Sequence, residues 1–223
     1  MSRTVGALLR KELLVELRTL ESVPGMSLFA VTTFVVFHFA LNRNVVEGDL
    51  ASGILWVTLL FAAILGVNRL FVADAEEGGL EGFLLAPVDR SAMLLAKALA
   101  LLVYLIALEL VAVPAFALLL DPSLTDSLAS LVGVIALGDL GVAVIGTLVA
   151  ALAVRTRARD LLGPLLALPL LVPVVIGAAR ASSPLLTVGG PGGPPARWLL
   201  TLGLYDLLFG LISYALFDFL LED

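Results

Sequence analysis

Long apolar runs separated by short polar segments dominate the sequence. A helix needs about 20 apolar residues to cross a hydrocarbon core of about 30 Å, and six runs meet that length. None shows the period-two alternation of a barrel strand, so we predict helices. The predicted spans are residues 23–41, 53–73, 91–120, 128–154, 161–179 and 198–220.

Composition places the chain in the class of polytopic membrane proteins. Hydrophobic residues make up 61% of the sequence and charged residues 14%, and the mean hydropathy is +1.11. The segments between the spans are too short for a second folded domain. The sequence therefore predicts an all-α integral membrane protein with one six-helix domain over residues 23–220.

Residues 1–22 have a different, amphipathic pattern. Their charged residues exclude the apolar core of a signal peptide. The apolar positions recur at helical spacing with the charges largely opposite: Val5, Leu8, Leu9, Leu13, Leu17 and Leu20. We predict an interfacial helix in the headgroup plane, after which Pro24 and Gly25 turn the chain into the membrane. A partner-binding helix or a merely solvated one would have the same pattern.

Residues 74–90, DAEEGGLEGFLLAPVDR, form a charged insert between two apolar spans. Acidic residues open it, which favours a helix N-terminus, and Pro87 would end the helix. Leu80, Phe83 and Leu84 lie on one helical face. The insert is either a docking surface for a soluble partner or an amphipathic connector.

The distribution of basic residues predicts the topology. With the N-terminus in the cytoplasm, ten Lys and Arg residues fall on the cytoplasmic side and Arg43, Arg180 and Arg197 fall outside. This positive-inside bias and the six spans place both termini and the insert in the cytoplasm. The net charge of -6 argues against nucleic acid as a partner.

Several kinds of chemistry are missing from the sequence. GGPGG at 189–193 is not followed by the Lys-Ser or Lys-Thr of a phosphate-binding loop, so we do not expect this chain to hydrolyse ATP alone. There is no cysteine, and His38 is the one histidine, so no metal site or enzyme constellation is predicted. His38 is interpreted as an interfacial residue, with haem ligation as the alternative.

Three carboxyl residues fall inside predicted spans: Glu109, Asp139 and Asp206. Each is either a neutral hydrogen-bonding group between helices or part of a polar path. Gly133, Gly138, Gly141 and Gly146 in the fourth span would let backbones approach closely, which predicts that this span is central to helix packing or to the dimer contact. The prolines of the fifth span predict a kink.

The run from Ser52 to Leu99 resembles the signature region of CcmB, the haem exporter permease of cytochrome c maturation system I. The matching elements are Gly53-Ile54-Leu55-Trp56-Val57, Arg69-Leu70-Phe71, Glu77-x-Gly79-Leu80-Glu81, Leu84-Leu85-x-Pro87 and Ala96-Lys97. The likeness extends over essentially the whole chain. At position 68 this chain has Asn68, where the family usually has an acidic residue before the arginine. Arg69 therefore has no acidic partner at the adjacent position.

The resemblance implies the permease subunit of an ABC transporter with ABC-2 type exporter architecture, in the bacterial inner membrane. It implies a self-dimer with two copies of a separate ATPase, haem-handling membrane subunits and a periplasmic haem chaperone. Haem would be a substrate rather than a bound cofactor, and ATP would act only through the ATPase.

The insert would be the coupling helix, which in related exporters sits in a groove of the ATPase. Its docking residues would be Glu76, Glu77, Gly79, Leu80, Glu81, Phe83, Leu84, Leu85, Pro87 and Arg90. Trp56 and Arg69 join the three carboxyls as candidates for a substrate path. A secondary transporter and a non-transporting assembly subunit are the competing interpretations. A secondary transporter needs ionisable coupling sites and usually has internal repeats, whereas this sequence has three isolated acids and no visible repeat.

Overall fold

The structure, a computed structural model, describes residues 2–41, 45–70, 90–120, 122, 127–154, 159–189 and 193–220. These residues form α-helices and one short 3-10 helix, and they contain no strand. The elements are α1 (Ser2–Thr19), α2 (Ser22–Leu41), α3 (Gly48–Arg69), α6 (Arg90–Leu120), α7 (Leu128–Val154), α8 (Arg159–Ser182), η1 (Ser183–Leu186) and α9 (Ala196–Leu220).

Six helices, α2, α3, α6, α7, α8 and α9, are long and apolar enough to cross a membrane. The prediction of an all-α membrane protein with six spans is confirmed. α3 begins at Gly48 rather than at 53 and α8 ends at Ser182 rather than at 179, whereas α7 has the predicted bounds. Polar residues at the end of an apolar run can continue its helical backbone hydrogen bonding. The outward faces of the helices are also apolar, as in Leu204 and Leu211 of α9, which suits contact with lipid.

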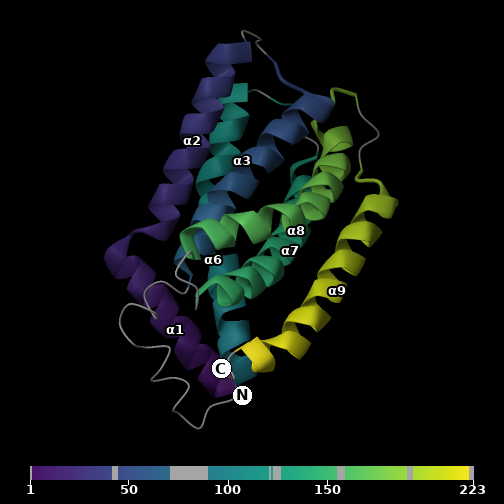
Figure 1. Cartoon of the computed structure of the whole chain (residues 1–223). Coiled ribbons are helices and arrows are strands. Elements are labelled where there is room, and N and C mark those ends of the chain that lie inside the picture. The colour runs from purple at the N-terminus through teal and green to yellow at the C-terminus, as the bar shows by residue number, and fades with distance from the viewer. Residues whose placement is uncertain are drawn as a thin grey trace.

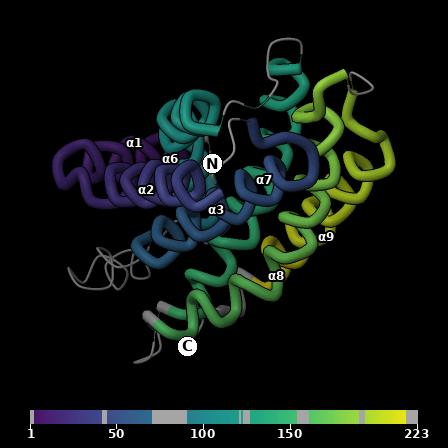
Figure 2. The backbone as a smooth tube through the Cα atoms, turned by 90° about the horizontal axis from the view of Figure 1, so that it is seen from above, coloured from purple at the N-terminus to yellow at the C-terminus, as the bar shows by residue number. Residues whose placement is uncertain are grey.

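The bundle is arranged around α3 and α7. Figure 2 shows α2 and α9 on opposite sides of the bundle, with α3 and α7 between them. α7 packs against α8 and α9, and α2 packs against α3 and α6. α1 begins and α9 ends at the same end of the bundle, where α1 slants across the first part of α6 (Figure 1).

Glycines of α7 allow the helices to approach closely. A Cβ at Gly138 would lie 2.4 Å from the ring of Trp56, one at Gly141 2.4 Å from Asp206 Oδ1, and one at Gly146 2.6 Å from Val67. The prediction of close packing is confirmed at these three positions. At Gly133 a Cβ would meet open space, so this glycine makes no close contact with the described residues of its own chain.

The turn between α1 and α2 lies earlier than predicted. Leu20 has a positive φ of 51° and its N–H bonds to the carbonyl of Glu16 at 2.8 Å, which ends α1 in the left-handed conformation. Pro24 instead occupies the first turn of α2, where its missing N–H costs no hydrogen bond. The hydrogen bonds at this turn are made by Glu16, whose carbonyl accepts from Leu20 and whose side chain accepts from the backbone of Ser22 and Val23.

α8 contains Pro164, Pro169 and Pro173 and still forms one helix. Figure 1 shows it bending across the bundle, as expected where prolines remove backbone donors. The hydroxyl of Tyr205 on α9 donates to the carbonyl of Leu170 at 2.9 Å. α9 thus supplies a hydrogen bond next to the proline-weakened part of α8.

Candidate functional site

The charged insert predicted to be a coupling helix lies outside the described residues. Nine of its ten docking candidates, Glu76 to Pro87, fall there, and of Arg90 the structure describes only its place as the first residue of α6. The structure does describe the two helices that flank the insert. α3 leads into it at Leu70 and α6 follows it, so the candidate site is built from these helix ends and from α1.

Lys97 is the buried centre of this junction. It lies two turns into α6, and its side chain is 3% exposed. Its Nζ lies 2.9 Å from Oε2 of Glu12 on α1 and donates to the carbonyl of Leu70, at the end of α3, at 2.7 Å. A buried ammonium is costly unless it is paired and hydrogen-bonded, and here α1 and α3 both supply acceptors.

The inner face of α1 combines apolar and acidic side chains. Val5 packs against Ala92 and Ala96 of α6, and Tyr104 of α6 donates from its hydroxyl to the carbonyl of Glu12 at 3.3 Å. Glu16 is buried and accepts hydrogen bonds from the backbone of Ser22 and Val23 at 3.0 and 2.8 Å. It caps the N-terminus of α2, where a negative charge is favoured.

The sequence pattern misplaced these two acids. We expected the charges of α1 to lie opposite its apolar side chains, whereas Glu12 and Glu16 point inward with Val5. Their partners, Lys97 and the start of α2, cannot be identified from the period of one helix. A lysine inside an otherwise apolar span was the available signal, and the resemblance marked Lys97 without assigning it a role.

The outer face of α1 carries arginines and leucines. Arg3, Arg10 and Arg18 are exposed, and no described residue pairs with them. Leu14, Leu17 and Leu20 are exposed beside them, at 42%, 70% and 59%. α1 therefore directs its acids toward the protein and its arginines away from it.

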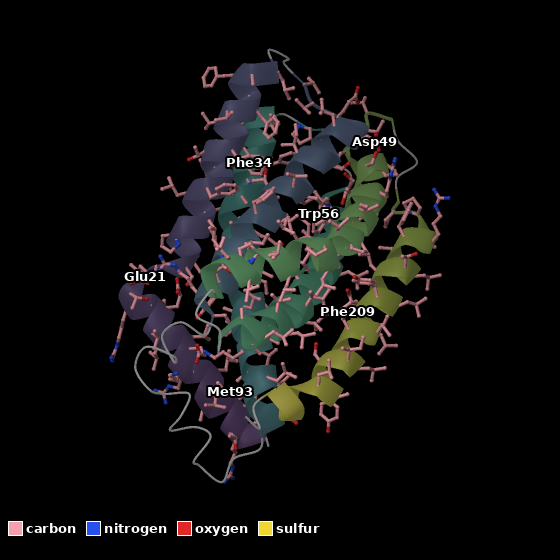
Figure 3. The ribbon with its side chains drawn as sticks, viewed as in Figure 1. Glu21, Phe34, Asp49, Trp56, Met93 and Phe209 are labelled. Atoms are coloured by element: carbon pink, nitrogen blue, oxygen red, sulfur yellow. The ribbon has the colours of Figure 1, made fainter. Side chains whose placement is uncertain are left out.

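Arg69 lies at the end of α3 and pairs with Glu21 in the turn between α1 and α2. Figure 3 shows Glu21 at this turn, away from the interior position of Trp56. Both side chains of the pair are more than half exposed. Arg69 is thus a link between α3 and the α1–α2 turn, and its acid comes from a distant segment rather than from position 68.

The intramembrane candidates separate into a pair and a single residue. The carboxyl groups of Glu109 on α6 and Asp139 on α7 interact with each other. Asp206 on α9 lies instead against Gly141 of α7. Buried oxygens of all three lack a hydrogen-bond partner among the described residues. The pair therefore brings a polar group of α6 near one of α7 within the apolar bundle.

Trp56 and His38 occupy structural positions. The Trp56 ring is buried in the bundle (Figure 3), and its Nε1 donates to the hydroxyl of Ser182 at 3.0 Å. His38 is exposed at the end of α2, with Nδ1 hydrogen-bonded to the carbonyl of Leu119. No group of three His, Asp or Glu side chains that could hold a metal occurs within the described ranges.

The opposite end of the bundle is held by polar contacts between loops. Glu47 accepts from the backbone of Val188 at 3.0 Å, and Ser127 donates to the carbonyl of Leu185 at 2.6 Å. Arg180 lies 3.5 Å from Asp49, near the top of the bundle in Figure 3. These contacts join the segment after α8 to the starts of α3 and α7.

The described residues thus define a six-span helical membrane protein with an amphipathic helix at one end. The family described as CcmB protein matches residues 3–213. The chain belongs to this family.

Three relatives named heme exporter protein B are similar to the chain. That of Bradyrhizobium diazoefficiens is 32% identical over 210 residues, which cover 92% of this chain and 93% of the relative. That of Pseudomonas aeruginosa is 31% identical, with 91% and 90% covered. That of Rhodobacter capsulatus is 35% identical over 156 residues, with 70% and 71% covered.

Proposed function

We propose that this chain is the permease subunit of an ABC transporter complex that acts in haem export and cytochrome c biogenesis in the bacterial inner membrane. The observation that carries the proposal is the family match over residues 3–213. The names of the relatives add haem as the cargo. Both termini are cytoplasmic in this proposal, on the side where α1 begins and α9 ends.

ATP would be hydrolysed by a separate subunit, because this sequence contains no phosphate-binding loop. We propose that two ATPase copies dock on residues 74–90 of a permease dimer. The geometry of the flanking helices supports this assignment, since α1, α3 and α6 meet at one buried lysine where the insert begins. Movement of the insert would therefore be transmitted to all three helices. The ATP would drive haem export or release of the haem-loaded chaperone.

We also propose that α1 is an interfacial helix. Its exposed leucines, and its arginines that pair with no described residue, suit the boundary between acyl chains and headgroups. Its inner face is held by α6, so it lies beside the span rather than apart from it. A tryptophan placed at Leu17 would test this placement, because brominated lipid should then quench more fluorescence than in the unmodified chain, which already has two tryptophans. No added quenching would contradict it.

Affinity purification of the permease from its native membrane tests the main proposal. We expect a nucleotide-binding subunit to accompany the permease, and ATP turnover to require that subunit. Turnover by the isolated permease, or a stable native complex without an ATPase, would overturn the proposal.

A further inference from the structure

The ammonium group of Lys97 joins three segments that are distant in the sequence. It belongs to α6, pairs with Glu12 of α1 at 2.9 Å and donates to the Leu70 carbonyl of α3 at 2.7 Å. We infer that Lys97 is a positioning residue that holds α1 onto both helices flanking residues 71–89, so that force on that segment is passed to α1. This inference rests on the proposed function.

The carbonyl of Leu70 accounts for the presence of a cationic side chain, Lys97, at the end of α3. The last carbonyl groups of a helix lack partners within it, and a cation near that end is stabilised by the helix dipole. Lys97 donates to the carbonyl of Leu70, the C-cap residue of α3 and the last described residue before the insert. The position of the chain as it enters the insert is therefore fixed by a side chain of α6.

Packing alone could have held α1 in place. Val5 already contacts Ala92 and Ala96, with Leu8 and Leu99 packed beside them. Apolar contacts often stabilise a fold as well as a buried ion pair does. A lysine offers directed donors instead, and these reach a carboxylate on one helix and a carbonyl on another. The geometry thus gives three helices one fixed relative position.

Two other polar contacts strengthen the same connection. Tyr104 of α6 donates to the Glu12 carbonyl, and Arg69 of α3 pairs with Glu21 beyond the end of α1. α1 is thereby attached to α6 along its length and to α3 at its end. We expect α1, the end of α3 and the start of α6 to move as one body.

Lys97→Met tests the inference, with Lys11→Met as a matched control. Lys11 also approaches Glu12, at 3.3 Å, but its side chain is 48% exposed. In the complex with the ATPase, we expect Lys97→Met to keep ATPase co-purification and ATP hydrolysis. Holo-cytochrome c formed per ATP should fall about tenfold, a usual size for coupling between sites. Lys11→Met should leave this ratio near the unmodified value.

A disulfide staple separates coupling from folding. The chain has no cysteine, so Val5→Cys with Ala92→Cys gives one new pair at an existing contact. In the Lys97→Met background, oxidation should restore the yield per ATP and reduction should remove it again. Glu12→Gln keeps the side-chain shape, and we expect it to lower the yield as well, which tests the inference even if Lys97→Met does not accumulate.

An unchanged yield per ATP in both Lys97→Met and Glu12→Gln would overturn the inference. So would a staple that forms but restores nothing, because Lys97 would then act other than by holding α1. If the ATPase does not accompany the unmodified permease, the proposed function fails first and the inference fails with it. Loss of ATPase co-purification in Lys97→Met alone would show that Lys97 serves docking rather than transmission, which also contradicts the inference.

Discussion

The indole ring of Trp56 lies directly on Gly138, in the space that a side chain at position 138 would need. A Cβ there would be 2.4 Å from Cη2 of the ring, closer than non-bonded carbon atoms approach. The ring is also held by its hydrogen bond to Ser182. α3, α7 and α8 therefore meet at one buried side chain, and none of the three can shift without disturbing the other two.

Gly138→Ala is expected to destabilise the bundle by about 1–3 kcal/mol, the usual cost of overpacking a core. Gly133→Ala, on the same helix, should be neutral or slightly stabilising, because its Cβ would meet open space. Thermal unfolding of the two detergent-solubilised variants measures the difference. Equal melting temperatures would contradict the close contact of Trp56 with Gly138.

Leu20→Gly is expected to stabilise the α1–α2 turn by about 1 kcal/mol. Leu20 has a φ of 51°, which costs an L-residue about 1–2 kcal/mol and glycine very little. Leu20→Ala is the matched control, since it removes the leucine side chain but keeps the strained Cβ. Melting temperatures that rise equally in both variants would show that the leucine side chain, not the backbone, is unfavourable.

The spans could be predicted from sequence because an apolar run of membrane length is a local property. The junction of α1, α3 and α6 could not. The partner of Glu12 that is near it in the sequence is the exposed Lys11. Only the packing of α1 on α6 brings the buried Lys97 to it. The turn at Leu20 could not be predicted either, because leucine has no preference for a left-handed backbone. Pro24 and Gly25 were the visible turn signals, and they are not where the turn lies.

The topology can be tested with single cysteines in this cysteine-free chain. Cysteines at Gly6 and Gly193 suit the test, because a side chain at either position would meet open space. Gly48 is less suitable, since its φ is +62° and Thr187 lies close. In intact cells we expect an impermeant thiol reagent to label position 193 and not position 6. Labelling at position 6 would reverse the proposed orientation.

Asp139→Asn is expected to leave both permease abundance and holo-cytochrome c yield near the unmodified level. The interaction of Asp139 with Glu109 needs a polar group that bridges α6 and α7, and an amide provides one. Asp139→Leu should instead lower abundance, because Glu109 would lose its partner. Immunoblots of membranes and haem staining of c-type cytochromes give the two quantities. Normal abundance with lost cytochromes in Asp139→Asn would favour a polar path through the bundle.

Leu84→Asp is expected to release the ATPase or uncouple its ATP hydrolysis, while the permease stays inserted. On a helix, Leu80, Phe83 and Leu84 would share one apolar face of a charged segment, and such a face usually marks a partner site. A charge placed in a packed contact costs a few kcal/mol, which is about a hundredfold in occupancy. Gly82→Asp adds the same charge to the same segment away from that face, so it should have little effect. Co-purified ATPase and holo-cytochrome c yield are measured against permease abundance for both variants. If Leu84→Asp matches Gly82→Asp, residues 74–90 are a connector, and the docking surface must lie elsewhere, such as on the exposed face of α1.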